Sequence, residues 1–141
     1  MTEKICELPT GYVPSEDEEF MNDFQREYFR RKLESWRDEL LKESDAVLKQ
    51  LQDEDKTTFT DIADYATAET DLGYELRSKE RARKLIAKID SSLQRIKDRT
   101  YGFCEKTGEP ISLKRLEARP VATLSIVAQE KHERDEKLKK D

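Results

Sequence analysis

One cysteine in this chain stands where a zinc ribbon would carry the first of its paired metal ligands. Cys104 precedes Thr107 by three positions in the loop "FCEKTGEP", whose glycine and proline mark a turn. A zinc ribbon has a second Cys-x-x-Cys pair about twenty residues later, where this chain reads "LSIVAQ" and offers Ser125 and Ala128. Because hydroxyl and methyl groups cannot supply a thiolate, the loop is predicted to hold no structural zinc.

Two other side chains are candidates for replacement metal ligands, Cys6 and His132. His132 lies one helical turn past Ala128, but a histidine on a highly charged helix is expected to be an ordinary surface residue. Cys104 then remains as a lone thiol. Inert burial is the favoured interpretation, and a redox sensor is the alternative if the thiol is exposed and its pKa is lowered.

The composition limits the class of protein. Charged residues make up 42% of the 141 residues and hydrophobic residues 35%, which suits long helices that each bury one narrow stripe. The net charge of −5 argues against primary nucleic-acid binding, since phosphate contacts need a basic surface. The sequence shows no signal-peptide run, membrane-length apolar stretch or disulfide framework, so we expect a cytoplasmic protein that does not bind membranes.

The chain predicts two long helices after a flexible leader at residues 1–15. Ser15 and Glu18 form a capping-box pattern at the start of the first helix, and a break is allowed for near residues 21–23. The segment "DEDKTTFTDIAD" ends this helix, and the second runs from about residue 64 to 99. Apolar residues recur at helical spacing in both helices: Phe20, Phe24, Phe29, Leu33, Trp36, Leu40, Val47 and Leu51, then Leu72, Leu76, Ile86, Ile89, Leu93 and Ile96.

Two such helices joined by a short loop bury their stripes most economically against each other. We therefore predict a mainly α fold, with a long antiparallel coiled-coil hairpin over residues 16–100 whose tip lies near residues 57–66. At about 1.5 Å per residue, about 25 residues on each side of the tip give an arm of roughly 40 Å. Such an arm can reach into a cavity on a larger partner. A hairpin that pairs with itself predicts a monomer.

Residues 101–141 predict a small basal lobe, a degenerate zinc-finger-like loop, followed by a C-terminal helix from about residue 123. Without a metal this lobe must be held together by packing. Tyr101 and Phe103 are expected as lids over an apolar core of Ile111, Leu113, Leu116, Val121, Leu124, Ile126 and Val127.

Two runs of this sequence resemble a known family. The run "YGFCEKTGEPISLKRLEARP" looks like the zinc-finger region of the DksA/TraR family of bacterial transcription regulators. The run "TDIADYATAETDLGYELRSKERARKLIAKI" resembles the tip and second arm of the coiled coil in that family, and the resemblance extends from about residue 19 to the C-terminus. It implies that the four zinc-binding cysteines of the family match Cys104, Thr107, Ser125 and Ala128, so the chain looks like a zinc-independent, cysteine-poor paralogue.

At the tip, Asp61, Asp64 and Ala66 match the functional residues of the family. Capping offers a second explanation, because Asp61 can N-cap the second helix and Asp64 stands where a capping-box acid belongs. The resemblance favours function, with both roles coexisting. A slender tip with two carboxylates can approach a basic residue or a metal-bound active centre inside a channel.

The resemblance implies a mode of action on RNA polymerase. The arm would enter the secondary channel of the polymerase and destabilise initiation complexes, which needs no cofactor and no sequence-specific DNA contact. Promoters of ribosomal RNA would be repressed and promoters of amino-acid biosynthesis activated, as a shift among polymerase–promoter states. The alarmone ppGpp would act jointly, at the interface between regulator and polymerase.

Specific residues of this chain match the contacts that the family makes. Arg81 matches a polymerase-binding residue, and the positions that match alarmone contacts are Leu85, Lys88, Arg119 and Gln129. Gln129 replaces a lysine of the family, which removes one cationic contact. Ordinary surface charge is the alternative for Arg81, Lys88 and Arg119, with Arg119 paired to an acid such as Glu117.

Two other classes of function remain. A channel-entering hairpin with an acidic tip could help polymerase hold a second Mg²⁺ and cleave backtracked RNA, although the "RLEARP" run points to the DksA/TraR family and not to cleavage factors. A coiled-coil adaptor that pairs with another chain is the second class, and the mass in solution distinguishes it. An independent enzyme is not expected, because the sequence has no nucleophile–base constellation and no phosphate-cradling glycine loop.

Overall fold

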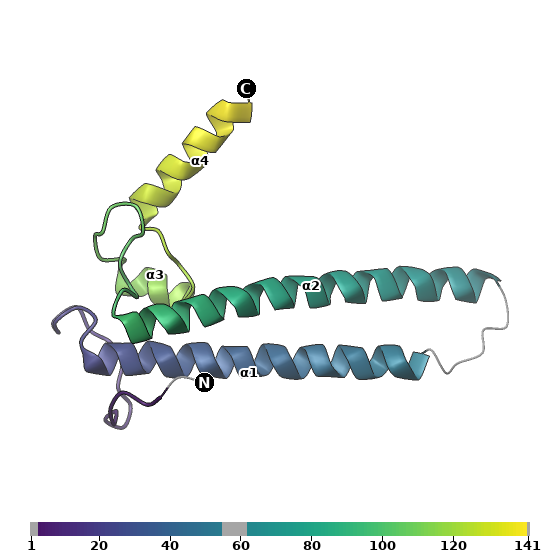
Figure 1. Cartoon of the computed structure of the whole chain (residues 1–141), viewed down its shortest axis with the longest axis horizontal. Coiled ribbons are helices and arrows are strands. Elements are labelled where there is room, and N and C mark those ends of the chain that lie inside the picture. Colours follow the sequence, from purple (N-terminus) through teal and green to yellow (C-terminus); the bar gives the residue numbers. More distant parts are fainter. Residues whose placement is uncertain (1–2, 55–61, 141) are drawn as a thin grey trace. The chain divides into compact units, whose positions relative to one another are not determined.

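The computed structural model describes residues 3–54 and 62–140, with the side chains of 3–44, 70 and 72–139 (Figure 1). Within these residues the fold is mainly helical and contains no strand, only an isolated bridge between Phe103 and Pro110. The helices are α1 (Asp23–Glu54), α2 (Ile62–Asp98), α3 (Leu113–Ala118) and α4 (Ile126–Lys140). None of the described helices is long and apolar enough to cross a membrane.

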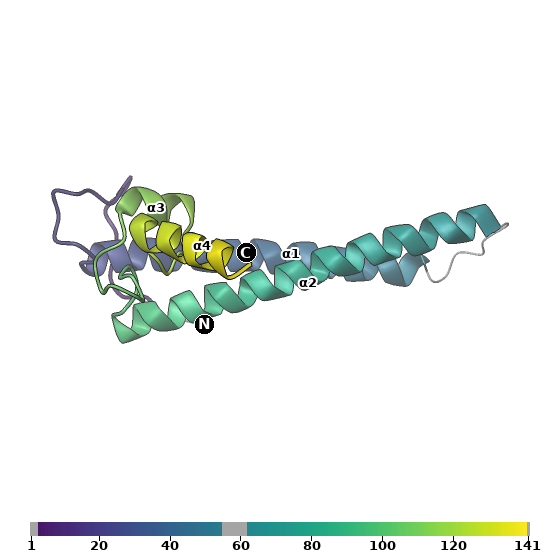
Figure 2. The ribbon, with the colours of Figure 1, turned by 90° about the horizontal axis from the view of Figure 1, so that it is seen from above.

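The chain divides into two compact units that share the two long helices. The base consists of Met1–Glu34 and Ile89–Asp141, and the arm consists of Ser35–Lys88. In each unit a segment of α1 runs antiparallel beside a segment of α2, which gives the predicted coiled-coil hairpin (Figures 1 and 2).

The first helix begins later than its capping-box pattern indicated. Ser15 and Glu18 do bond reciprocally, with Ser15 N donating to Glu18 Oε2 at 3.3 Å and Glu18 N to Ser15 O at 3.3 Å, but they close an isolated turn. Met21 then takes φ 55°, a left-handed conformation in which a helix cannot continue. Asn22 caps α1 through its side chain, which accepts from Gln25 N at 2.8 Å. Residues 15–22 therefore form turns and not the predicted first part of the helix, and α1 begins at Asp23.

The core of the base combines the ends of the two long helices with the C-terminal lobe. Phe29 and Leu33 of α1 and Ile89 of α2 are each 0% exposed. The ring of Phe29 packs on the ring of Tyr101, with centroids 5.6 Å apart. The lobe adds Cys104, Ile111, Leu116, Val121, Ala122 and Ala128 to the buried set.

The lobe packs differently from the predicted core in two places. Tyr101 is not a lid but a core residue, 1% exposed, whose hydroxyl donates to Pro120 O at 2.7 Å. Ile126 and Val127, predicted as core, are 53% and 73% exposed. The reason is the start of α4, which buries Ala128 and therefore turns the two residues before it outward.

The arm buries much less than the base. Among its described side chains (35–44, 70 and 72–88), Trp36, Leu40, Leu72 and Ile86 are half-buried and none is fully buried. Leu76, part of the predicted stripe, is 49% exposed.

Candidate functional site

The four positions that match zinc ligands are partly brought together, around the sulfur of Cys104. Cys104 is 3% exposed, and the Thr107 hydroxyl and the backbone of Ser125, Thr107 and Lys106 are polar groups that act on the pKa of its thiol. Burial by itself would raise the pKa of the Cys104 thiol. These polar groups, the Thr107 hydroxyl first, outweigh burial and lower this pKa to about 6. The finger, residues 101–125, thus places polar groups around a thiol where a metal site would place further thiolates.

The remaining two positions serve the start of α4. Ser125 Oγ accepts a hydrogen bond from Ala128 N at 3.2 Å, and Ser125 O accepts one from Gln129 N at 2.8 Å. Ser125 is therefore the helix cap, while the Ala128 methyl group is buried in the core. A structural zinc ion needs four N or S ligands, so these residues do not fit one. Within 3–54 and 62–140, no group of three His, Cys, Asp or Glu residues could hold a metal ion.

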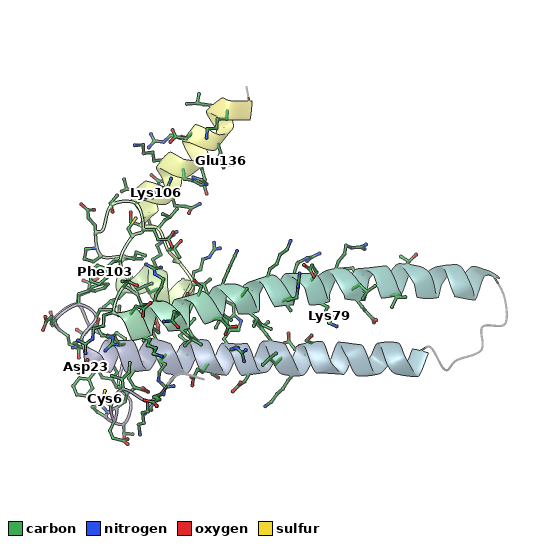
Figure 3. The ribbon with its side chains drawn as sticks, viewed as in Figure 1. Cys6, Asp23, Lys79, Phe103, Lys106 and Glu136 are labelled. Carbon is green, nitrogen blue, oxygen red and sulfur yellow. The ribbon has the colours of Figure 1, made fainter. Side chains whose placement is uncertain are left out.

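The two candidate replacement ligands have other partners. Cys6 Sγ lies 3.5 Å from the backbone oxygen of Asp23 at the start of α1, and Figure 3 shows both residues there. His132 Nε2 lies 3.6 Å from Glu136 on the next turn of α4. Neither contact involves the Cys104 loop.

Arg119 is not paired with Glu117 in this structure. Glu117 accepts a hydrogen bond from the Tyr28 hydroxyl and forms an ion pair with Lys32 at 3.1 Å, both on α1. Burial, followed by the bond to Glu117, raises the pKa of Tyr28 to about 12. Arg119 ends α3, where its backbone N donates to Arg115 O at 2.8 Å, and it is exposed. Its guanidinium is thus available on the surface of the lobe.

The other positions that match alarmone and polymerase contacts lie on helices. On α2, in the arm, Arg81 and Lys88 are exposed and Leu85 is half-buried. Gln129 lies on α4, in the base, where its side-chain amide donates to Glu133 at 3.1 Å. These residues belong to two units, so their gathering at one interface stays a prediction.

The tip residues of the candidate site lie partly outside the described residues. Asp61 lies outside the described residues. Asp64 and Ala66 lie in the first turns of α2, and only their backbone is described. The capping and functional explanations of the two acids therefore both stay predictions.

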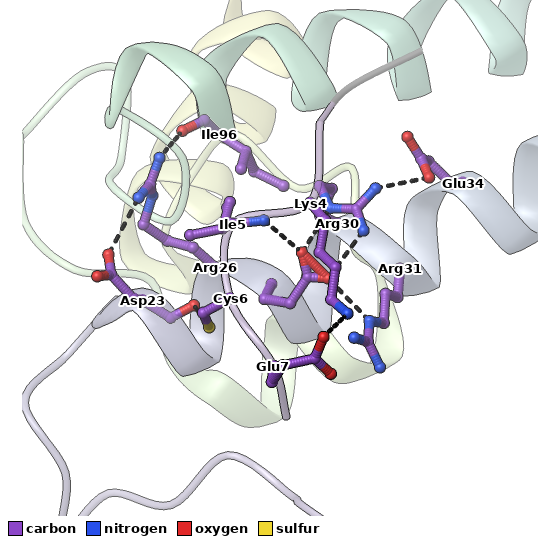
Figure 4. Close-up of polar contacts among 11 residues, drawn as sticks. Lys4, Ile5, Cys6, Glu7, Asp23, Arg26, Arg30, Arg31, Glu34 and Ile96 are labelled. Atoms are coloured by element: carbon purple, nitrogen blue, oxygen red, sulfur yellow. Dashed lines mark hydrogen bonds and ion pairs between the residues drawn. The ribbon is translucent and has the colours of Figure 1, made fainter. Parts of the chain in front are cut away.

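Sequence reasoning missed a buried charge cluster at the start of α1. Glu27 is 0% exposed and accepts hydrogen bonds from Arg30 (2.7 and 2.8 Å), Arg31 (2.8 Å) and the backbone N of Ile5 (2.9 Å), as drawn in Figure 4. Arg30 is itself buried and also bonds Glu34 at 2.7 Å. The available signal was a glutamate with arginines both three and four residues later, a spacing that pairs charges on one helix face.

The Glu27 cluster holds its carboxylate ionised. Burial by itself would raise the pKa of Glu27, but the bonds from Arg30, Ile5 N and Arg31 outweigh it and lower the pKa to about 2. The cluster also fixes the leader to α1, because Ile5 supplies one of the donors. The segment predicted as a flexible leader thus makes specific contacts with the base.

The molecule is a helical hairpin followed by a small finger and a C-terminal helix. Two family models match: the N-terminal domain of the DnaK suppressor protein DksA over residues 25–96, and the prokaryotic dksA/traR C4-type zinc finger over residues 99–134. Together with the relatives described next, they show that the chain belongs to the DksA/TraR family.

The curated relatives are named RNA polymerase-binding transcription factor DksA. The protein from Caulobacter vibrioides is 55% identical over 132 residues, which is 94% of this chain and 92% of the relative. The protein from Escherichia coli K12 is 44% identical over 115 residues, 82% of this chain and 76% of the relative. Among solved structures, the transcription factor DksA2 from Pseudomonas aeruginosa matches with a TM-score of 0.78 and 40% identity, covering 84% of this chain and 90% of that one. The zinc-finger model matches here although three of the four metal positions carry other residues.

Proposed function

We propose that this protein regulates bacterial transcription by binding RNA polymerase, with the arm inserted in the secondary channel. The observation that carries the proposal is the extent of the similarity, 55% identity over 94% of the chain to a relative named for polymerase binding. The hairpin supports it, since long antiparallel helices with few buried side chains suit a probe that reaches into a partner. The protein acts as a monomer in the cytoplasm and carries out no reaction of its own.

The tip changes the balance between polymerase–promoter states. Asp61, Asp64 and Ala66 approach the catalytic centre and destabilise initiation complexes, which lowers output from ribosomal RNA promoters. Promoters of amino-acid biosynthesis gain output through the same shift among polymerase–promoter states. A protein can only shift such an equilibrium by its differential affinity for the two states, so the tip must contact one of them more strongly.

The alarmone ppGpp strengthens this effect at the interface with polymerase. Two exposed cations, Lys88 on α2 and Arg119 at the end of α3, supply donors for its pyrophosphates. Tyr28 and Lys32 support this role for Arg119, because they occupy the carboxylate of Glu117 that could otherwise neutralise it. Gln129 supplies no charge, so the response is weaker than that of a relative with lysine there.

The protein acts without structural zinc. Two observations support this proposal. The side-chain oxygen of Ser125 is engaged in capping α4, and the methyl group of Ala128 is buried in the core. Backbone hydrogen bonds across the loop, from Cys104 N to Glu109 O at 2.8 Å and from Ile111 N to Gly102 O at 2.7 Å, close it in place of a metal.

A transcription assay with purified polymerase tests the proposal. The protein should inhibit a ribosomal RNA promoter, inhibit it more with ppGpp, and do both equally well after treatment with a strong chelator. Metal analysis of the purified protein should find no stoichiometric zinc, and chelation should leave the melting curve unchanged.

Each part of the proposal fails on a different result. Absence of any effect on either promoter class would exclude action on initiation. Stimulated cleavage of backtracked RNA would indicate the alternative factor, and one equivalent of tightly held zinc would contradict zinc independence.

A further inference from the structure

The described segment before α1, residues 3–22, extends beyond the predicted leader (1–15) and is called the leader from here on; it touches the finger at the turn that follows α2. The ring of Phe20 meets the ring of Phe103 edge to face, with centroids 5.4 Å apart and planes at 85°. A Cβ built on Gly102 would lie 2.8 Å from Met21 Cε and 3.3 Å from Phe20 Cζ, so both side chains cover this glycine closely. The turn also needs glycine for its φ of 89°. A segment from the N-terminus therefore packs directly on the first turn of the finger.

The part of the leader that makes this contact is fixed to α1 by one buried side chain. Gln25 is 0% exposed, and its Oε1 accepts from Met21 N at 2.7 Å. Its Nε2 donates to Ser15 O at 3.2 Å and to Glu18 at 3.1 Å. Met21 has a φ of 55°, which is uncommon outside glycine and persists only where surrounding contacts determine it. The position of Phe20 and Met21 is thus imposed by α1.

The covered turn begins the set of hydrogen bonds that closes the finger. Gly102 O accepts from Ile111 N at 2.7 Å, and Phe103 forms the bridge with Pro110. Cys104 N donates to Glu109 O at 2.8 Å. Two further bonds hold the finger: Arg95 Nη2 of α2 donates to Phe103 O at 2.7 Å, and Glu105 N donates to Thr123 O at 2.8 Å. No metal-binding group of three His, Cys, Asp or Glu residues is found among the described residues to add to them. Hydrogen bonds are much weaker than metal–thiolate bonds, so the closed loop needs support from outside itself.

We propose that the leader is a brace for the finger. Phe20 and Met21, held on α1 by Gln25, keep the Gly102–Phe103 turn closed, and so do the work that a bound metal does in a four-cysteine finger. The proposal assigns part of the stability of the loop to a segment that lies about eighty positions earlier in the chain. The brace goes beyond the action on polymerase and does not depend on it.

Amide hydrogen exchange on the full chain tests the brace. In the variant Phe20→Ala/Met21→Ala, the amides of Cys104 and Ile111 should exchange about tenfold faster than in the parent. The amides of the last turns of α2 should keep their protection, because that helix packs independently on α1. Val13→Ala is the matched control, since Val13 lies in the same leader and is 66% exposed. It should leave all of these rates unchanged.

A milder pair of variants covers the case in which the double substitution unfolds the base. Phe20→Leu and Phe103→Leu each remove one ring from the pair, and the combined variant should accelerate exchange less than the product of the two single effects. Unchanged exchange at Cys104 and Ile111 in Phe20→Leu would overturn the proposal. Equal acceleration of the α2 amides would overturn it as well, because the leader would then stabilise the whole base and not the finger.

Discussion

In the base, α1 and α2 enclose Phe29, Leu33 and Ile89, each 0% exposed, whereas in the arm the same two helices leave Tyr74 60% and Leu76 49% exposed. Every described side chain that is fully buried belongs to the base. Fully burying such a side chain contributes about 1.5–3 kcal/mol. The difference indicates that the base supplies most of the folding free energy, while the arm can carry residues chosen for contact with a partner.

Removing the buried charge of the base is the strongest test of whether stability is concentrated there. Glu27→Ala leaves Arg30, 7% exposed, without its main partner, which should cost about 3 kcal/mol of unfolding free energy. Urea unfolding followed by circular dichroism measures this loss. Glu39→Ala is the matched control, since Glu39 is an exposed acid on the α1 segment of the arm, and it should cost less than about 0.5 kcal/mol. Equal losses in the two variants would show that stability is not concentrated in the base.

Acid should weaken the base through the same residue. The pKa of Glu27 is about 2 in the folded protein, below its ordinary value of 4.5, so its contribution is complete above the ordinary value. That contribution is lost as the pH falls from 4.5 toward 2. Between about pH 6 and about pH 3, the parent should therefore lose more stability than Glu27→Gln, which has no carboxyl group to protonate. Parallel losses in the two proteins would show that other carboxyl groups dominate.

The same contrast explains what the sequence could and could not predict. Periodicity identified both long helices and the hairpin, because the apolar stripes at Phe29 and Leu33, and at Ile89, recur at helical spacing. It could not find Glu27 as a buried residue, since burial there depends on Ile5 from the leader. Nor could it decide that Ile126 faces solvent, because hydrophobicity does not fix which side of a short helix packs on the lobe.

Some features of the candidate site could be predicted from residue types, and others could not. Residue types at the four zinc positions supported the prediction of a loop without zinc, which metal analysis has to test. The lowered pKa of Cys104 was not predictable, because most of the groups that lower it belong to the backbone, whose direction depends on the folded loop. Likewise, only the fold shows that Glu117 is engaged by Tyr28, a residue far away in the sequence.

Surface cations of both units should have smaller effects on stability than on regulation. Lys88→Ala in the arm and Arg119→Ala in the base should each change the unfolding free energy by less than about 0.5 kcal/mol, because both side chains are exposed. Each should reduce the added effect of ppGpp in the transcription assay and keep most of the basal inhibition. Lys84→Ala removes an exposed cation one turn before Lys88 and is the control.

The substitution Gln129→Lys should have the opposite effect on the response to ppGpp. If the position lies beside the phosphates, the added cation should strengthen the response to ppGpp. A parent-like response in the two alanine variants would mean that Lys88 and Arg119 are ordinary surface charge.

The tip should show the smallest effect on folding and a clear effect on function. Asp64→Asn keeps the size of the side chain and much of its capping ability, because asparagine caps helices about as well as aspartate. The unfolding free energy should therefore fall by about 0.5 kcal/mol or less, which is the loss of a charge near a helix N-terminus. Binding to polymerase, measured by competition, should stay near normal because the proposed mode of binding assigns most of the contact to the rest of the hairpin and the base. Inhibition of a ribosomal RNA promoter, measured in the same buffer, should be strongly reduced.

Asp38→Asn makes the outcome at Asp64 interpretable, because it removes an exposed acid from the α1 segment of the arm. It should leave folding, binding and inhibition unchanged. If Asp64→Asn also inhibits fully, then the charge at the tip is only a helix cap, and the arm acts by occupying the channel. If Asp64→Asn loses binding together with inhibition, the carboxylate contributes to docking and not to a step after entry. Only retained binding with lost inhibition assigns the folding energy to the base and the regulatory step to the tip.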